Sequence, residues 1–499
     1  MKSKTAFQKT VPGKQDWKKR LPYILALAGL FCGANLLFRM LWFDEVLTVN
    51  LILKLPLKKI YFAYEIPNNH ILFTFLEKIW FSLCGILDQS AYYLFRIPVM
   101  VTGSAAIFLL SRELLKKYTL LPVCAVCGAF VCSSVWAMYS TAVRGYMQGF
   151  FLTVLSLIVM KEWMRKRKFF PGGVLYGLLC LLSVGTVPSN LAALAGVSLF
   201  FLPETFRRKS WKIWWGSVLL PAAALGIFYL PILDKFLGCI RLGEGWFSRT
   251  DALCTLYTGA FFPAAILVCA ALTAFAGIFL HSRKRHTQIR VLCDIMILLL
   301  PAGAILFMKV PPFPRVFFPL VAVWLCIGTR YYSFWTRHHC IRQHRAILWT
   351  VLLLQGIWSL FFFQGQAEKA GNFLYGSDGR GDDYIAPYYA RNDFEPGKVI
   401  RFIKEQQIRN DNTVRFFATF DADAPSLLFA AHLNGLEEGI LYADTLNMPR
   451  TLRFDLLPGE KYIIACGEAD LNITLQRFSF RKGVPVKSFG LQKIYKVIP

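Results

Sequence analysis

The stretch "LPYILALAGLFCGANLLFRMLWFDEVLTVN", Leu21–Asn50, decides the class of this chain. Its first part, Leu21–Met40, is an apolar run, and a run of ~17–25 such residues is long enough to cross a bilayer. Two adjacent carboxylates, Asp44 and Glu45, follow directly. Each would cost roughly 2.5–3.5 kcal/mol at the centre of a membrane. The pair therefore marks either the boundary of a span or a site.

Composition extends this interpretation to most of the chain. Of 499 residues 56% are hydrophobic, with 44 Phe and 13 Trp, and apolar runs recur as far as Phe363. A soluble protein of this length is rarely so apolar. The fold class is therefore mainly α, a polytopic membrane protein.

The formal charge of +26 suggests a nucleic-acid partner until the positions of the charges are considered. The basic residues cluster in short segments between apolar runs, which is typical of cytoplasmic loops and not of a nucleic-acid surface. The clusters are residues 1–20, Arg112–Lys117, Lys161–Lys168, Arg207–Lys212, His281–His286 and Arg337–Arg345. We expect residues 1–20 to be a cytoplasmic N-terminus, followed by a retained first span.

One segment breaks the alternation of sides. Ile71–Leu87 is short and carries Glu77 and Lys78 in its middle. If it crossed, all later basic clusters would lie outside, so we expect an amphipathic helix on the outer membrane surface. The result is about eleven spans in the inner membrane, a transmembrane domain of residues 21–363, and an outer loop of residues 42–96.

The composition changes after residue 363. Residues 364–394 are a polar, Gly- and Asp-rich linker, and residues 395–499 are predicted to form a small exported α/β domain. We expect helices at Glu395–Gln407 and Ser426–His432, and strands at Thr413–Phe420, Lys461–Cys466 and Gly490–Ile498. Asp421 and Asp423 are expected to cap the second helix.

Two further features are expected to be structural. Cys124 and Cys127 have redox spacing, but they lie in an apolar helix, where a cysteine behaves as a small hydrophobe. Asp294 lies at the inner start of a span.

Four short stretches fall on the outer side. They are "FDE" (Phe43–Glu45), "EIPNNH" (Glu65–His70), "STAVRGY" (Ser140–Tyr146) and "PPFPRVFFP" (Pro311–Pro319). Together they resemble the GT-C superfamily of integral-membrane glycosyltransferases, in the branch of protein O-mannosyltransferases and lipid A aminoarabinose transferases. Those enzymes carry an Asp-Glu pair after the first span, a His-led turn before a membrane-surface helix, and an Arg-x-Tyr after the third span.

The matching residues are Asp44-Glu45, "NNHIL" (Asn68–Leu72) and Arg144-Gly145-Tyr146, with "LFRIPVMVTG" (Leu94–Gly103) similar to the opening of the second span. The resemblance covers residues 21–363. This chain departs from the pattern at Ile71-Leu72, where the family has two prolines.

The resemblance implies an inverting hexosyl- or pentosyltransferase that uses a polyprenyl-phosphate-linked sugar as donor. The acceptor would be a glycan, a lipid or a protein. Asp44 would be the general base, and Glu45 would raise its pKa or bind a water or a cation. A divalent cation is not required by the pattern and stays open.

Phosphate recognition is assigned to arginine, because its guanidinium can bind phosphate with two hydrogen bonds. Arg144 is the first candidate and Arg315 the second. The remaining predicted substrate contacts are Glu65, Asn69, His70 and Tyr146. No Gly-rich nucleotide loop is present in the sequence, which favours a lipid-linked donor.

Other interpretations stay open. Asp44-Glu45 could be a solvated helix end, and for Arg96 we favour an interfacial side chain that reaches toward water. A transporter or flippase would also have many spans, but with ionisable groups in mid-span and internal repeats. A membrane scaffold that displays the C-terminal domain gives no reason for the outer carboxylates.

Overall fold

The structure is a computed structural model of the 499-residue chain. It describes residues 13–34, 36–41, 43–64, 69–85, 89–167, 169–242, 249–254, 285–308, 312, 314–335, 395–409, 414–418, 424–437, 439–443, 459–466, 468–490 and 492–498. Contacts divide the chain into two compact units. The first contains residues 1–35, 99–141 and 145–359, and the second contains residues 36–98, 142–144 and 360–499.

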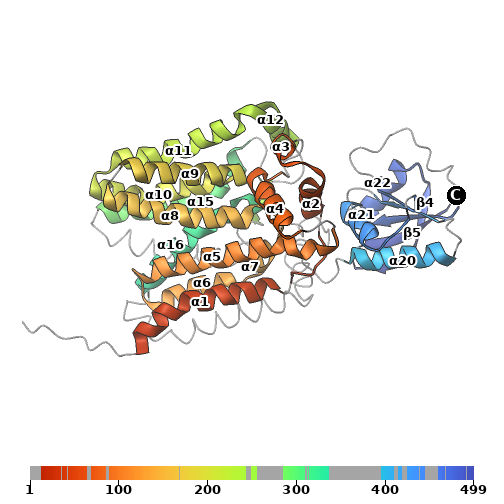
Figure 1. The fold of residues 1–499 in the computed structure, drawn as a ribbon, viewed down its shortest axis with the longest axis horizontal. Coiled ribbons are helices and arrows are strands. Elements are labelled where there is room, and N and C mark those ends of the chain that lie inside the picture. The colour runs from red at the N-terminus through yellow and green to blue at the C-terminus, as the bar shows by residue number, and fades with distance from the viewer. Residues whose placement is uncertain are drawn as a thin grey trace, which may run out of the picture. The chain divides into compact units, whose positions relative to one another are not determined.

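The first unit is built from helices (Figure 1). They are α1 (Gly13–Ala34), α5 (Arg96–Leu115, whose first turn belongs to the second unit), α6 (Leu120–Val131), α7 (Ser134–Tyr139), α8 (Tyr146–Lys166), α9 (Phe169–Thr186), α10 (Asn190–Arg208), α11 (Trp211–Tyr229), η2 (Leu230–Ile232), α12 (Leu233–Leu242), α13 (Arg249–Cys254), α15 (Arg285–Phe307), η4 (Pro314–Leu320) and α16 (Val321–Trp335).

Five described helical segments are long and apolar enough to cross a membrane. They are Ala91–Leu115, Tyr146–Lys166, Trp211–Cys239, His286–Phe307 and Arg315–Phe334. A polytopic, mainly helical fold is thus confirmed. The count of about eleven spans stays a prediction, because parts of it fall on residues 255–284 and 336–394, outside the described residues.

Close helix packing depends on glycine where a large side chain lies against a backbone. α9 packs along α8 on one side and α11 on the other, and α10 packs against α11 and α15. A Cβ atom at Gly172 would lie 2.4 Å from the Trp163 ring, so only glycine allows α9 to approach α8 at this point. On α6, Cys124 and Cys127 are free thiols.

Two helices of this unit end at basic residues. α8 is followed by the cap residue Arg167 and α10 by the cap residue Lys209, both in the left-handed conformation that commonly closes a helix. Nη2 of Arg167 donates to the carbonyl of Arg208 at 3.0 Å. The cap residue of α8 thus satisfies a backbone carbonyl at the end of α10. Cationic last turns also complement the negative end of each helix dipole.

The second unit begins with short helices before α5. They are α2 (Phe43–Lys54), α3 (Leu57–Ile60), α4 (Ile71–Leu83) and η1 (Gln89–Phe95). The helix predicted at Ile71–Leu87 therefore exists, with a shorter C-terminal end. Its exposed apolar side chains are Leu76, Ile79 and Leu83. Its position on the membrane surface stays a prediction.

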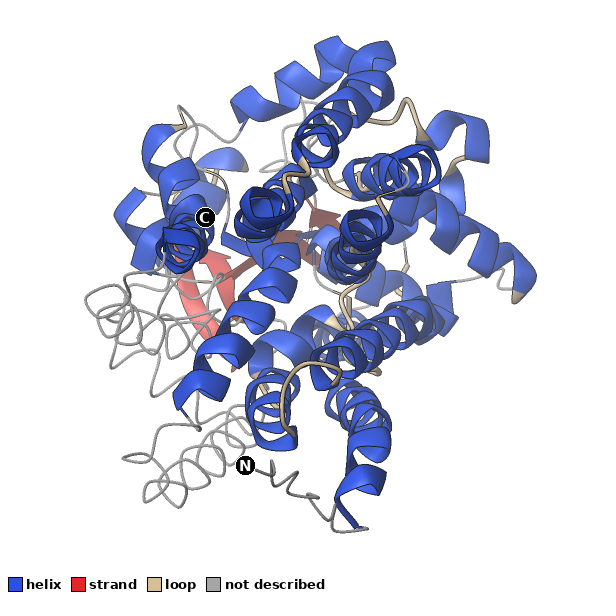
Figure 2. Cartoon of the chain, turned by 90° about the vertical axis from the view of Figure 1, so that its left-hand side faces the viewer, coloured by secondary structure: helices blue, strands red, loops and turns tan. Residues whose placement is uncertain are grey.

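A five-stranded sheet forms the C-terminal part of the second unit, with the order β2-β1-β3-β5-β4 (Figures 1 and 2). The strands are β1 (Arg415–Ala418), β2 (Leu441–Ala443), β3 (Lys461–Ala465), β4 (Lys482–Phe489) and β5 (Gln492–Ile498). β1 is parallel to β2 and β3, whereas β5 is antiparallel to β3 and β4. The helices are α20 (Pro396–Arg409), α21 (Ala424–Leu433) and α22 (Glu468–Arg477).

The alternation of side chains along the strands separates two apolar layers. Phe416 and Ile464 pack with Ile400 and Leu427 of α20 and α21, whereas the neighbouring Phe417 packs against Phe478 on the other face. The predicted small α/β domain is confirmed. The two predicted helices and three predicted strands are present, whereas β2, α22 and β4 were missed. Asp421 and Asp423 lie outside the described residues.

Candidate active site

The first turn of α2 carries both carboxylates of the motif. Asp44 and Glu45 are buried, with 6% and 1% of their surfaces exposed. A helix N-terminus is a favourable place for negative charge, because its free N–H groups and its dipole are positive there. Thr48, one turn further, donates from Oγ1 to the carbonyl of Asp44 at 2.9 Å. The pair is therefore not a solvated helix end.

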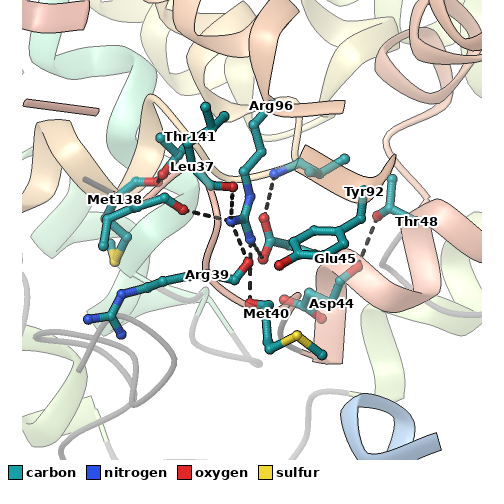
Figure 3. A network of polar contacts seen from close by, with 12 residues as sticks. Leu37, Arg39, Met40, Asp44, Glu45, Thr48, Tyr92, Arg96, Met138 and Thr141 are labelled. Carbon is teal, nitrogen blue, oxygen red and sulfur yellow. Dashed lines mark hydrogen bonds and ion pairs between the residues drawn. The ribbon is translucent and has the colours of Figure 1, made fainter. Parts of the chain in front are cut away.

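Both oxygens of Glu45 are used by the protein itself (Figure 3). Nη2 of Arg96 donates to Oε2 at 3.1 Å, and the backbone N–H of Val143 donates to Oε1 at 2.8 Å. Glu45 thus connects α2 to the start of α5 and to the segment that precedes α8. Both carboxylate oxygens therefore already accept hydrogen bonds from the protein, and these bonds fix the position of the side chain.

Our interpretation of Arg96 as an interfacial side chain was wrong. The residue is 2% exposed, and its Nη1 donates to the carbonyls of Leu36, Leu37 and Arg39 at 2.7, 2.9 and 2.7 Å. These carbonyls belong to the turn that leads into α2, and Figure 3 shows the guanidinium between this turn and Glu45. The burial is stable because the ion pair and the carbonyls replace the water that the cation loses.

Beside this network, Arg144 meets three side chains. Its Nη2 lies 3.1 Å from Nε2 of His70 and 3.9 Å from Oδ2 of Asp44, and its Nη1 lies 3.4 Å from Oγ1 of Thr48. All four residues are buried. Because arginine only donates, Nε2 of His70 must accept, so the imidazole is neutral with its proton on Nδ1.

The turn before α4 is fixed by Asn69. Its Nδ2 donates to the carbonyls of Ile60 and Ala63, both at 2.8 Å, and its Oδ1 accepts from Thr74 at 3.1 Å. This amide, which we predicted to contact substrate, holds the turn that presents His70. Glu65 lies outside the described residues.

The other two predicted residues belong to the first unit. Tyr146 is buried at the start of α8, edge-to-face with Tyr139 at a centroid distance of 5.5 Å. Arg315 is half-buried in η4. Among the described residues, no group of three or more His, Cys, Asp and Glu side chains could bind a metal ion.

The structure therefore brings together Asp44, Glu45, Asn69, His70 and Arg144 within the second unit. Sequence reasoning missed the contacts of Thr48 and Arg96. Thr48 could have been found, since residues four apart share a helix face and Asp44 opens the helix.

Comparison with known proteins gives the fold. No family model matches the sequence, and no curated protein matches it. The solved structure of ArnT from Cupriavidus metallidurans, a lipid A aminoarabinose transferase, is similar over nearly the whole chain. In the apo state it superposes with a TM-score of 0.53 and 12% identity over 97% of this chain and 98% of that chain.

Two further structures are similar. ArnT bound to undecaprenyl phosphate gives a TM-score of 0.51 at 12% identity over 98% of both chains. The apo oligosaccharyltransferase of Archaeoglobus fulgidus gives a TM-score of 0.48 at 12% identity, over 95% of this chain and 73% of that chain. At 12% identity these likenesses concern the fold: this chain has the fold of the ArnT structures.

Proposed function

We propose that this protein is a membrane glycosyltransferase that moves a sugar from a polyprenyl-phosphate donor to an acceptor on the outer side of the membrane. The observation that carries the proposal is the buried cluster of Asp44, His70 and Arg144, in which a carboxylate and a guanidinium lie 3.9 Å apart. Glycosyl transfer from a lipid phosphate needs a base for the acceptor and a cation for the leaving phosphate. This cluster contains both.

Asp44 is the general base of this proposal. It removes the proton of the acceptor hydroxyl as the oxygen attacks the anomeric carbon, a contribution of ~10²–10⁴-fold when the base is well placed. Attack from the face opposite the phosphate gives inversion. The ion pair with Arg144 is long, so Arg144 can turn from the carboxylate to the incoming phosphate.

Arg144 receives the charge that develops on the departing phosphate. The C–O bond of the donor breaks, its electron pair stays on the polyprenyl phosphate, and the guanidinium stabilises that anion with charge-assisted hydrogen bonds. Neutral His70 accepts from the same guanidinium and orients it. Tyr146 and Arg315 remain candidates for contacts with the donor.

Glu45 has a positioning role in this proposal instead of the catalytic one that the motif suggested. Its carboxylate is bound by Arg96 and by the N–H of Val143, the residue before Arg144. It therefore keeps the base on α2 in register with the phosphate partner. Asn69 acts in the same way on His70.

The donor class is supported by the fold. A structure that shares the fold was solved with undecaprenyl phosphate bound. The test is incubation of the purified protein with a panel of polyprenyl-phosphate sugars and cell-envelope acceptors. We expect one donor to be consumed, with release of the free polyprenyl phosphate. No release from any donor, with movement of the intact lipid across vesicles, would indicate a flippase instead.

A further inference from the structure

Two cysteines of the first unit lie at the ends of neighbouring helices. Cys32 belongs to the last turn of α1, and Cys132 is the cap residue that follows α6. Both are half-buried, free thiols. α1 packs against α6 and α7, and the three helices lie side by side in Figure 1. Neither cysteine takes part in the proposed transfer reaction.

Contacts on both sides of the cysteines set the register between these helices. A Cβ atom at Gly128 of α6 would lie 3.9 Å from Cδ2 of Leu25 on α1. Further along both segments, Nε1 of Trp136 in α7 donates to the carbonyl of Gly29 at 3.0 Å. The residue numbers rise together in the two contacts, so α1 lies along residues 128–136 in the same direction.

This register brings the two thiols to the same place. Cys132 lies one helical turn beyond Gly128. Cys32 shares the helix face of Leu25 and Gly29, because residues three, four and seven apart lie on one face. The thiols of Cys32 and Cys132 also share a side-chain hydrogen bond. The packing of the helices and the hydrogen bond agree that the two sulfur atoms are neighbours.

Glycine allows the backbones to come close at this point. A Cβ atom at Gly29 would lie 2.7 Å from the Trp136 ring, and one at Gly33 would lie 2.8 Å from Oγ of Ser140. Gly33 directly follows Cys32. A disulfide bond requires Cα atoms about 4.4–6.8 Å apart, whereas the axes of packed helices are about 8–10 Å apart. Small neighbours of this kind are what a disulfide between two helices needs.

We propose that Cys32 and Cys132 form a reversible disulfide bond that joins α1 to α6. The oxidant is itself a disulfide, either of a thiol oxidoreductase or of a small thiol compound. A thiolate of the pair attacks this disulfide and releases one thiol, and the second cysteine then displaces the other. Each cysteine loses one proton and one electron, and the products are the Cys32–Cys132 bond and two reduced thiols of the oxidant.

The expected compartment suits this reaction. The charge-derived topology, which stays a prediction, places the last turn of α1 and the end of α6 on the outer side. Disulfide bonds form and persist outside the cytoplasm, where thiols are not kept reduced. The bond would hold the first span against α6 and α7. Cys124 and Cys127, by contrast, belong to one helix, so a bond between them would join no separate elements.

The experiment tests the link by cutting the chain between the two cysteines. A recognition sequence for a site-specific protease is inserted after Lys117, an exposed residue between α5 and α6. The purified full-length protein is treated with oxidised glutathione, its remaining thiols are blocked, and the chain is cleaved. On a denaturing gel without reductant we expect the two fragments to migrate as one species, and to separate after reduction.

Serine variants identify the two sulfur atoms. Cys32→Ser and Cys132→Ser should each abolish the link. The matched control is Cys124→Ser, which removes another half-buried thiol of α6 and should leave the link unchanged. Mass spectrometry of the linked wild-type peptides identifies the same two cysteines, so the test holds even if a serine variant does not fold.

Three outcomes would overturn the proposal. The first is separation of the wild-type fragments although the exposed Cys84 has reacted, which shows that the oxidant was effective. The second is loss of the link in Cys124→Ser, because Cys124 would then be the partner. The third is a species with the mass of two chains before cleavage, because the bond would then join different molecules. A link that is present before oxidation and is lost on reduction supports the proposal.

Discussion

Arg144 and His70 lie 3.1 Å apart, with a guanidinium nitrogen donating to Nε2 of the imidazole. The two residues are 74 positions apart in the sequence, yet each is 3% exposed. This contact defines the protonation state of the histidine and the direction of the guanidinium. It also places both beside Asp44, so that the proposed base and the proposed phosphate-binding cation lie in one buried cluster.

Replacement of Arg96 by alanine should lower the free energy of unfolding of the protein. Arg96→Ala leaves Glu45 buried without its cation, and three backbone carbonyls lose their donor. The loss of one partner of a buried ion pair costs ~3–5 kcal/mol. The measurement is the free energy of unfolding in detergent.

The control for this variant is Arg112→Ala, which changes an exposed arginine on the same helix. It should shift stability by no more than ~0.5 kcal/mol. If both variants were equally stable, Arg96 would be a surface residue and the positioning role of Glu45 would be wrong.

The failure to predict the role of Arg96 has a physical cause. An arginine at the start of a span looks the same in sequence whether its head group reaches water or buried carbonyls. Its partners, Glu45 and the turn at Leu36–Met40, are more than fifty residues away. The membrane class, by contrast, depends on local composition, and the Asp-Glu pair stands out because carboxylates are costly within a span and this pair directly follows an apolar run.

In the C-terminal domain, too, some elements could be predicted from their local sequence and others could not. β1 and β3 were predicted because their residues are largely apolar, and the structure buries most of them, whereas β4 is largely exposed and contains Pro485. A strand without a buried face has no alternating pattern to find. β2 has only three residues, too few for any period.

Glu77 should make stability depend on pH. Burial raises the pKa of this carboxyl on α4 well above its ordinary value of 4.5. The folded state therefore binds the proton more tightly than the unfolded state, and this contribution to stability is lost as the pH rises toward the raised pKa. Relative to Glu77→Gln, the wild type should lose up to ~1.4 kcal/mol per pH unit above about pH 4.5.

The measurement is the free energy of unfolding of the wild type and of Glu77→Gln at pH values from 5 to 9. A difference between them that does not change with pH would show that the carboxyl titrates equally in the folded and unfolded states.

The C-terminal α/β domain should fold alone. A fragment that begins at Gly381 contains the apolar layer around Phe416 and Leu427, both 0% exposed, and should unfold in one cooperative transition. Leu427→Ala should destabilise it by ~2–5 kcal/mol because it creates a cavity. Val486→Ala, at a side chain that is 48% exposed, is the control. A fragment without a cooperative transition would show that the domain needs the rest of the chain.

Sidedness can be tested with two cysteines of opposite expected location. Lys116→Cys, at the start of the loop after α5, should react only with a reagent applied from the cytoplasm. Lys58→Cys, in the predicted outer loop, should react only from outside. Both are placed in a chain in which the exposed Cys84 is replaced by Ser. Labelling of the Lys116→Cys variant from outside would contradict the charge-derived topology.

The most direct test of the proposed function is the turnover of Asp44→Asn with the identified donor and acceptor. Asparagine keeps the shape of the side chain but cannot accept the proton, so turnover should fall ~10²-fold or more with little change in donor affinity. Arg144→Ala is the matched comparison, since it should weaken donor binding as well, and Arg144→Lys should restore it only in part. Each variant must show wild-type membrane insertion and unfolding temperature. A stable Asp44→Asn protein that transfers sugar at a near-normal rate would contradict the assignment of Asp44 as the base.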